Sequence, residues 1–379
     1  MRNTRPRAAE LAAAGLLLVV AACSYRSTTM DADEVATELR QRGLDPNAVV
    51  YPHGITDEMR AWAHQAVDGA KSELERLTRL QASLLDPGQL PVRYQWGYTG
   101  TAVEVFEYRQ ANCLAFTNLF VGMARELGVE VYYLGVNDIE SYRREGDLVV
   151  VSDHIAVGYG TLSDRTIFDF SQTPPDDYHD FSRISDLTAI AMFHSNRGAE
   201  ALQAGLVEAS VRWLETAVRI DPQLANAWVN LGVALRRQGD HGAAEQAYRK
   251  AVEIDPRTYS AYQNLASLLR LLRRLEEARA YEQILASSPN RNPFTYLTLG
   301  DVSLLGGRLD EAEKLYRRAV RRKPDDADAY AALGHLAASS GNLRTARRML
   351  RRAQKFEDAG EHPRVRRLEE ILARHDGGR

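Results

Sequence analysis

Apolar residues recur every three to four positions in several stretches before residue 128, and this spacing predicts amphipathic helices. The first begins after Thr56, which can cap it, and another ends at the turn signal of 86–88. The last runs from Cys113 to Leu127, with Asn112 at the N-cap position and Gly128 at the stop position. Its apolar stripe consists of Phe116, Leu119, Phe120, Met123 and Leu127.

Three runs that follow this helix are rich in β-branched and aromatic residues, and polar or glycine-containing segments separate them. They cover 129–136, 148–159 and 166–170. Such runs predict strands. A helix followed by antiparallel strands is typical of an α+β domain, which we place at 55–190.

From residue 191 the pattern becomes helical and repetitive. Prolines at 222, 256, 289 and 324 are 34, 33 and 35 residues apart, a period that indicates stacked repeats. We divide 191–360 into five units: 191–224, 225–258, 259–292, 293–326 and 327–360. The second unit resembles a tetratricopeptide repeat in the order of its large and small residues, and the fourth repeats this order. In the second unit these residues are Trp228, Leu231, Gly232, Gly239, Ala244, Tyr248, Ala251 and Pro256.

Two units depart from the pattern. In the third, Arg273 replaces the loop glycine and Tyr281 comes one residue early, so its second helix is expected to shift. The fifth has Leu350 and Asp358 at the aromatic and proline positions, as expected of a terminal unit that caps the array. The sequence therefore predicts an all-α repeat solenoid, followed by a helix or tail at 361–379.

The N-terminal 22 residues have the features of a secretory signal. Arg2, Arg5 and Arg7 precede an apolar run over 11–22, and Cys23 follows. The string from Val20 to Cys23 resembles the lipobox of bacterial lipoproteins, which implies a lipid on Cys23 and a place in the cell envelope, on the periplasmic face of the outer membrane. The alternative is an ordinary signal peptide. We interpret 23–54 as a tether with a short helix at 31–41.

Composition narrows the chemistry. The formal net charge of -3 gives no reason to expect nucleic acid as a partner. Cys23 and Cys113 are the two cysteines of the chain, so a lipidated Cys23 would leave Cys113 without a disulfide partner. Such a thiol is either a small buried core residue or a nucleophile. No pair of cysteines or cluster of histidines has the spacing of metal ligands, and we expect neither a metal nor another cofactor.

Cys113, His154 and Asp169 together suggest nucleophilic catalysis. Cys113 begins a predicted helix, whose partial positive charge favours a thiolate. His154 lies in the second predicted strand, where it would take the thiol proton, and Asp169 lies in the third, where it would orient the ring. Asp153 and Asp164 are alternative partners for His154. The backbone N–H of Cys113, with Gln95 or Trp96, would stabilise the oxyanion.

This segment resembles the transglutaminase-like superfamily. The run from Arg109 to Val121 is similar to the family's Cys helix, and 153–157 and 168–170 are similar to its His and Asp strands. The resemblance covers 55–190 and implies a papain-like thiol triad acting on a side-chain amide or peptide bond. Ala111 departs from it, because relatives often carry Gly there.

The repeats offer candidate contacts for a peptide or protein partner. Asn196, Asn230 and Asn264 occupy the same place in three successive units, and Arg236, Arg237 and Arg270 lie about two turns further on. Amides can bind an extended peptide backbone, and Arg can pair with a carboxylate. The alternative is that the amides tie adjacent repeats together.

Two functions remain open at this point. The first is an envelope lipoprotein with a thiol acyl-transfer domain, acting as a peptidase, amidase or transglutaminase, whose repeats bind a partner. The second is a non-catalytic peptide-binding scaffold or assembly lipoprotein.

Overall fold

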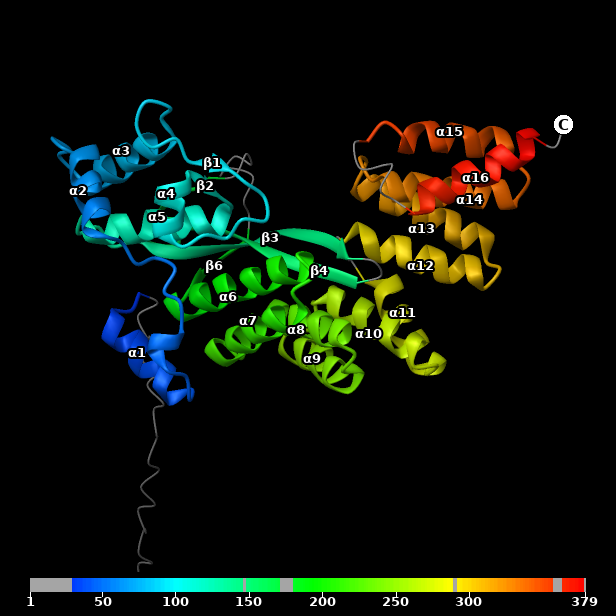
Figure 1. Cartoon of the computed structure of the whole chain (residues 1–379), viewed down its shortest axis with the longest axis horizontal. Coiled ribbons are helices and arrows are strands. Elements are labelled where there is room, and N and C mark those ends of the chain that lie inside the picture. The colour runs from blue at the N-terminus through cyan, green and yellow to red at the C-terminus, as the bar shows by residue number, and fades with distance from the viewer. Residues whose placement is uncertain (1–28, 146–147, 171–179, 289–291, 357–362, 378–379) are drawn as a thin grey trace, which may run out of the picture.

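The computed structural model describes residues 29–145, 148–170, 180–288, 292–356 and 363–377. An N-terminal α/β region is followed by a long run of helices, as predicted (Figure 1). Within the described residues, no helix is both long enough and apolar enough to span a membrane. The signal peptide and Cys23 lie outside these residues.

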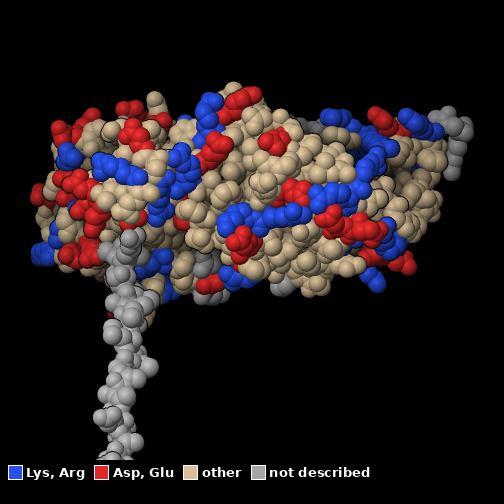
Figure 2. All heavy atoms as spheres, turned by 90° about the horizontal axis from the view of Figure 1, so that it is seen from below, with Lys and Arg blue, Asp and Glu red and all other residues tan. Residues whose placement is uncertain are grey.

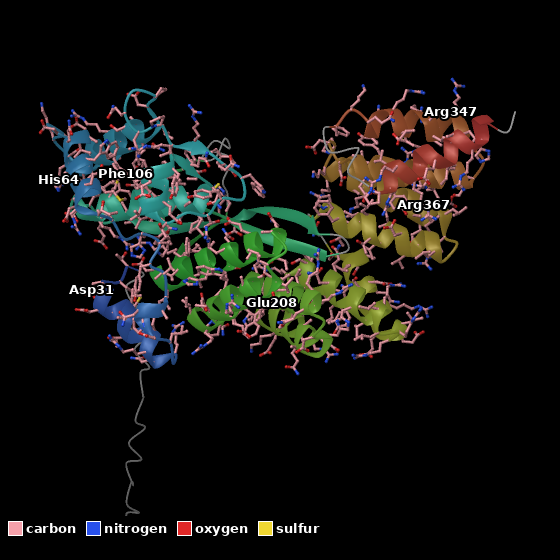
Figure 3. The ribbon with its side chains drawn as sticks, viewed as in Figure 1. Asp31, His64, Phe106, Glu208, Arg347 and Arg367 are labelled. Carbon is pink, nitrogen blue, oxygen red and sulfur yellow. The ribbon has the colours of Figure 1, made fainter. Side chains whose placement is uncertain are left out.

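The segment predicted as a tether is folded in its described part. Asp31 caps α1 (Ala32–Gln41) through its side chain (Figure 3), and the 3₁₀ helix η1 (Pro46–Ala48) follows. Val35 and Leu39 of α1 are buried in one cluster with Ile190 and Ile220 of the helical run. The short helix predicted at 31–41 is present as α1, but the segment is not a tether over these residues, because its apolar side chains cover the start of the repeat array.

The described residues of the α/β region form four helices and two β-sheets. The helices are α2 (Asp57–Ala66), α3 (Glu73–Leu85), α4 (Ala102–Tyr108) and α5 (Cys113–Glu126). A small parallel pair joins β1 (Arg93–Tyr94) to β2 (Gln110–Ala111). The main sheet is antiparallel in the order β5–β4–β3–β6. Its strands are β3 (Tyr132–Glu145), β4 (Leu148–Gly160), β5 (Arg165–Phe168) and β6 (Phe181–Ile184).

The central helix α5 positions the rest of this region. All residues from 114 to 124 are buried, and a helix that is covered on every side belongs to a core. It packs against β4 on one side and against α2, α3 and α4 on others. Its first residue, Cys113, therefore lies at a fixed point beside the sheet.

Strands β3 and β4 form a hairpin that is longer than the rest of the sheet. Their register shifts next to His154: it pairs with Val136, whereas Asp153 pairs with Glu140, so β3 advances four residues while β4 advances one. Such irregularities bend a strand and are frequent next to functional sites. Beyond the shift, the hairpin reaches over the helical run, where β4 packs against the helices over 225–238 and 259–271 (Figure 1).

Five helix pairs follow in the part of the chain that the structure describes. Their helices are α6 (Asp186–Gln203), α7 (Val207–Ile220), α8 (Ala225–Gln238), α9 (His241–Ile254), α10 (Tyr259–Leu271), α11 (Leu275–Ser287), α12 (Pro293–Leu305), α13 (Leu309–Arg322), α14 (Ala327–Ser339) and α15 (Leu343–Ala353). The last helix, α16 (Pro363–Gly377), packs against α14 and α15. Residues 361–379 are thus helical over their described part.

Glycines permit the close crossing of the two helices in a pair. A Cβ atom on Gly232 would lie 2.5 Å from the ring of Tyr248, and one on Gly300 would lie 2.4 Å from the ring of Tyr316. In the fifth pair, Leu368 of α16 takes the place beside Gly334. The final helix thereby supplies the bulk that the degenerate fifth unit lacks.

Candidate functional site

The local sequence places Cys113 at the first turn of α5. Asn112 is the N-cap, and its side-chain oxygen accepts a hydrogen bond of 2.9 Å from the N–H of Ala115. Its amide group donates to Thr99 at 2.7 Å, which fixes the cap in the fold. The Cys113 side chain is half-buried. Its own N–H has no acceptor in the part of the chain that the structure describes, as is usual in a first helical turn.

His154 and Asp169 form a buried pair beside it. Nε2 of His154 lies 3.1 Å from Oδ2 of Asp169, and both side chains are more than nine-tenths covered. The second carboxylate oxygen of Asp169 accepts from the N–H of Phe170. Because the carboxylate is held from two sides, it can hold the imidazole in one orientation.

The imidazole also reaches the sulfur, since His154 makes a side-chain hydrogen bond with Cys113. Burial by itself disfavours a charged ring. The hydrogen bonds to Asp169 and Cys113 and the negative charge of both partners outweigh burial and raise the pKa of His154 to about 10. The three side chains proposed from the sequence therefore lie together, in an arrangement that stabilises an imidazolium at neutral pH.

Aromatic stacking explains why these distant segments meet. The ring of Phe116 on α5 stacks on Phe170, with centroids 4.3 Å apart, and that of Phe120 stacks on Phe168 at 5.2 Å. Both partners flank Asp169 in sequence. Since the two phenylalanines of α5 are one helical turn apart, they anchor the segment around Asp169 along the helix that begins with Cys113.

Tyr94 is a polar neighbour of the sulfur that sequence reasoning missed. Its hydroxyl lies 4.0 Å from Sγ of Cys113, and its ring is 5.9 Å from that of Phe170. Burial and the neighbouring Cys113 and Asp169 raise the pKa of Tyr94, so its phenol keeps its proton and can donate. The sequence held one signal for Tyr94: the predicted oxyanion donors, Gln95 and Trp96, are the next two residues of the chain.

Gln95 and Trp96 are both exposed on this segment. The backbone N–H of Gln95 donates to the carbonyl of Ala111 at 2.9 Å, so it is already used in the chain. Ala111 itself is buried in β2, and its φ is not in the left-handed region. The turn before Cys113 therefore accommodates an alanine.

The alternative acids for His154 are not in contact with it among the described side chains. Asp164 is exposed, and its N–H is bonded to Thr161. The side chain of Asp153 lies outside those that the structure describes. Asp169 is thus the carboxylate that the fold brings to the ring.

The candidate peptide-binding residues of the repeats differ in how deeply they are buried. Asn196 is half-buried on α6, whereas Asn230 and Asn264 are almost fully buried. The amide of Asn230 donates to Ser195 of the preceding unit at 3.2 Å, which fits the interpretation that these amides tie repeats together. Arg236 donates to Ser267 at 3.0 Å, and Arg270 forms a two-pronged pair with Glu282.

Comparisons with known proteins agree with this architecture. A model of the transglutaminase-like superfamily matches residues 60–146, a range that includes Cys113 and ends before His154 and Asp169. Tetratricopeptide repeat models match 225–257, 247–280 and 303–372. No curated protein matches the chain.

Solved structures resemble the chain over about half its length. In the APC/C hetero-tetramer Cut9–Hcn1 the match has 19% identity and a TM-score of 0.43, and it covers 49% of this chain but 37% of that one. For Pseudomonas aeruginosa pilF the values are 24% and 0.43, with 49% and 84% covered. YrrB, described as a tetratricopeptide repeat protein with an unusual peptide-binding site, matches at 19% and 0.34, with 48% and 92% covered. The chain thus contains a transglutaminase-like domain, matched over 60–146, followed by tetratricopeptide repeats within 225–372.

Proposed function

We propose that this protein is a thiol acyl-transfer enzyme of the bacterial cell envelope, in which Cys113 is the nucleophile. The observation that carries the proposal is the contact of His154 with both Cys113 and Asp169. A structural cysteine has no need of a charged, buried partner, because burying a charge costs free energy unless it is compensated. A nucleophile needs such a partner to become a thiolate.

The reaction would proceed in two steps. The Cys113 thiolate attacks the carbonyl carbon of an amide, so that an S–C bond forms and an electron pair moves to the oxygen. When that pair returns, the C–N bond breaks, and the leaving amine takes the proton of the His154 imidazolium. Water or a second amine then loses a proton to His154 and attacks the thioester, which releases the product and restores the thiolate.

The oxyanion formed in each step needs donors. The N–H of Cys113 is one, because nothing in the described chain accepts from it. Tyr94 supports a second, since its hydroxyl lies near the sulfur and its raised pKa keeps it protonated. The side chains of Gln95 and Trp96 stay candidates on the same exposed segment.

An acyl-trapping experiment tests this function. The full chain is incubated with an activated aryl ester, and the position of the acyl group is mapped by mass spectrometry of peptides. We expect a thioester at Cys113 that is absent in Cys113→Ala and strongly reduced in His154→Ala. Acylation confined to lysines, with the same yield in all three proteins, would instead favour a non-catalytic scaffold.

The repeats and the N-terminus complete the proposal. Tetratricopeptide repeats typically bind peptides or proteins, and here they would present a substrate or recruit a partner. A lipid on Cys23 would hold the enzyme at the membrane, on the periplasmic face of the outer membrane. Metabolic labelling with a clickable fatty acid tests the anchor: the label should disappear in Cys23→Ala and persist in Cys113→Ala, and labelling that survives in Cys23→Ala would refute it.

A further inference from the structure

The junction of the third and fourth repeats contains two adjoining hollows. One, of about 420 Å³, lies between α10, α11 and α12, and the other, of about 460 Å³, lies between α11, α12 and α13. The two share four lining residues: Arg270, Glu282, Leu299 and Val302. The Arg270–Glu282 ion pair therefore stands in the wall between them, and together they form one interrupted groove, which we call the junction groove.

The junction groove is lined by leucines that are unusually exposed. Leu305, at the end of α12, is 86% exposed, and Leu271 and Leu275 also rank among the exposed large apolar residues. Ile284 of α11 and Leu309 of α13 are exposed as well, and so is Leu272 in the turn after α10. Apolar side chains gathered on one surface mark an interaction site more often than isolated ones do.

The earlier part of the array is less accessible. The hairpin of β3 and β4 lies over it, with β4 packed against α8 and α10 (Figure 1). Val229 and Val233 of α8 are fully buried, and Ser260 of α10 is nearly so. A partner that approaches the folded protein would therefore find exposed apolar surface at the junction groove rather than under the hairpin.

The charge of the groove is positive. Among its arginines, Arg270 pairs with Glu282 and Arg308 pairs with Glu311. Arg273 differs, because its side chain makes no hydrogen bond or ion pair with the part of the chain that the structure describes, although its backbone N–H donates to the carbonyl of Arg270. Its neighbour Arg274 shows the contrast, since it pairs with both Glu245 and Glu277. Figure 2 shows basic and acidic side chains interspersed on the face seen from below.

Arg273 also occupies a position that favours glycine. Its φ is 62°, whereas Gly239, Gly307 and Gly341 stand at the corresponding turns of other repeats with φ of 94°, 73° and 75°. A left-handed conformation is unfavourable for a residue with a side chain, because the Cβ atom crowds the backbone. The third repeat thus keeps a strained, unpaired cation at the edge of the groove.

We propose that the junction groove binds an acidic amphipathic helix of a partner protein. Leucines of the helix would enter the two hollows beside Leu271, Leu299 and Leu305, and its carboxylates would pair with Arg273. This rests on the proposed partner-binding role of the repeats and names the place and the chemistry of that partner. Helix-in-groove recognition requires apolar anchors at helical spacing, and the complementary charge selects among such helices.

The test uses a fluorescent synthetic peptide of about 15 residues, long enough to form a helix, with leucines along one face and glutamates elsewhere. Binding to the full chain is followed by fluorescence anisotropy at several salt concentrations. We expect saturable binding that weakens with salt. A matched peptide with lysine in place of glutamate should bind at least about tenfold more weakly.

Two variants locate the site. Leu305→Asp should weaken binding at least about tenfold, because it removes an apolar contact and adds a repelling charge. Arg273→Gly should weaken it by up to about fivefold, as expected for an exposed ion pair, without harming the fold, since glycine suits this turn. The matched controls are Leu206→Asp, at a leucine that is 58% exposed outside the groove, and Arg351→Ala on α15; both should bind as the wild type does.

Equal binding of the acidic and basic peptides, or unchanged binding by Leu305→Asp, would overturn the proposal. A concentration-dependent dimer in light scattering that Leu305→Asp dissociates would also overturn the proposal. The occupant of the groove would then be a second copy of this chain. The thiol function is scored separately in the same samples, by alkylation of Cys113. Normal alkylation without peptide binding refutes the groove alone.

Discussion

Two buried histidines, one in each region of the molecule, have pKa values that are shifted in opposite directions. His154 in the transglutaminase-like domain is 7% exposed, and His194 on the first helix of the repeat array is 2% exposed. The pKa of His154 is raised to about 10, whereas burial lowers that of His194 to about 4. The difference lies in their neighbours, because a carboxylate and a thiol face the first ring.

The surroundings of His194 are apolar. Its ring lies 4.9 Å from that of Trp213, and its Nε2 lies 3.4 Å from the carbonyl oxygen of Val50. One carbonyl does not offset the loss of hydration, so the neutral ring is favoured. Burial alone therefore produces a structural histidine, and burial with Asp169 and Cys113 produces one that can hold a proton for catalysis.

The largest expected effect comes from neutralising Asp169. In Asp169→Asn the ring keeps a polar neighbour of the same size but loses the negative charge, so we expect the pKa of His154 to fall below about 7. Histidine-selective NMR titration measures it. Asp164→Asn is the matched control and should leave the pKa near 10. A pKa that stays near 10 in Asp169→Asn would show that another group protonates the ring.

A second effect concerns stability in acid. The pKa of His194 in the folded protein is below its unfolded value of 6.5. Its contribution to the free energy of unfolding is therefore complete above pH 6.5, and it declines at lower pH, where the unfolded chain takes up a proton. We expect a loss of about 2 kcal/mol of unfolding free energy between pH 7 and pH 5. His53, whose pKa burial also lowers to about 4, contributes in the same direction.

Denaturant melts at the two pH values measure this loss. His194→Gln keeps a donor for the carbonyl of Val50 and does not titrate. The variant should therefore reduce the pH dependence of the unfolding free energy to the part that is due to His53. The sign is reversed for His154, whose contribution is complete below pH 6.5 and declines as the pH rises towards 10. A stability that is independent of pH between 5 and 7 would contradict the burial argument for His194.

The smallest expected effect tests the separation of the two regions. Leu305→Asp lies on α12, which is remote in sequence from the α/β domain, and we expect the alkylation rate of Cys113 to change by less than about twofold. Ala111→Val, directly before the Cys113 cap, is the positive control and should slow alkylation. A large change in Leu305→Asp would show that the repeats control the thiol.

The repeats were predictable because their contacts are local and recur. The prolines at a period near 34 residues and the pairing of Gly232 with Tyr248, then Gly300 with Tyr316, repeat one packing solution. Even the departures were visible, since Arg273 at a glycine position takes a φ of 62°. The packing of the segment predicted as a tether was missed, because the partners of its apolar residues lie more than 100 positions away along the chain.

The site was predictable in its members but not in its geometry. Asn112 and Gly128 marked the ends of the helix that begins with Cys113, and both act there as expected. The extension of β3 to residue 145 was not predicted, because polar residues over 137–145 show no alternation. The order of strands in the sheet and the short β6 were not predicted either. Tyr94 was missed, since only the pairing of β1 with β2 brings it to the sulfur.

The central claim is that His154 makes the Cys113 sulfur anionic, and the pH dependence of its alkylation by iodoacetamide tests this most directly. We predict rapid modification at pH 6 in the wild type and a rate about 100-fold lower in His154→Ala, because the thiol then lacks the base that takes its proton. Identical profiles of rate against pH in both proteins would contradict the account.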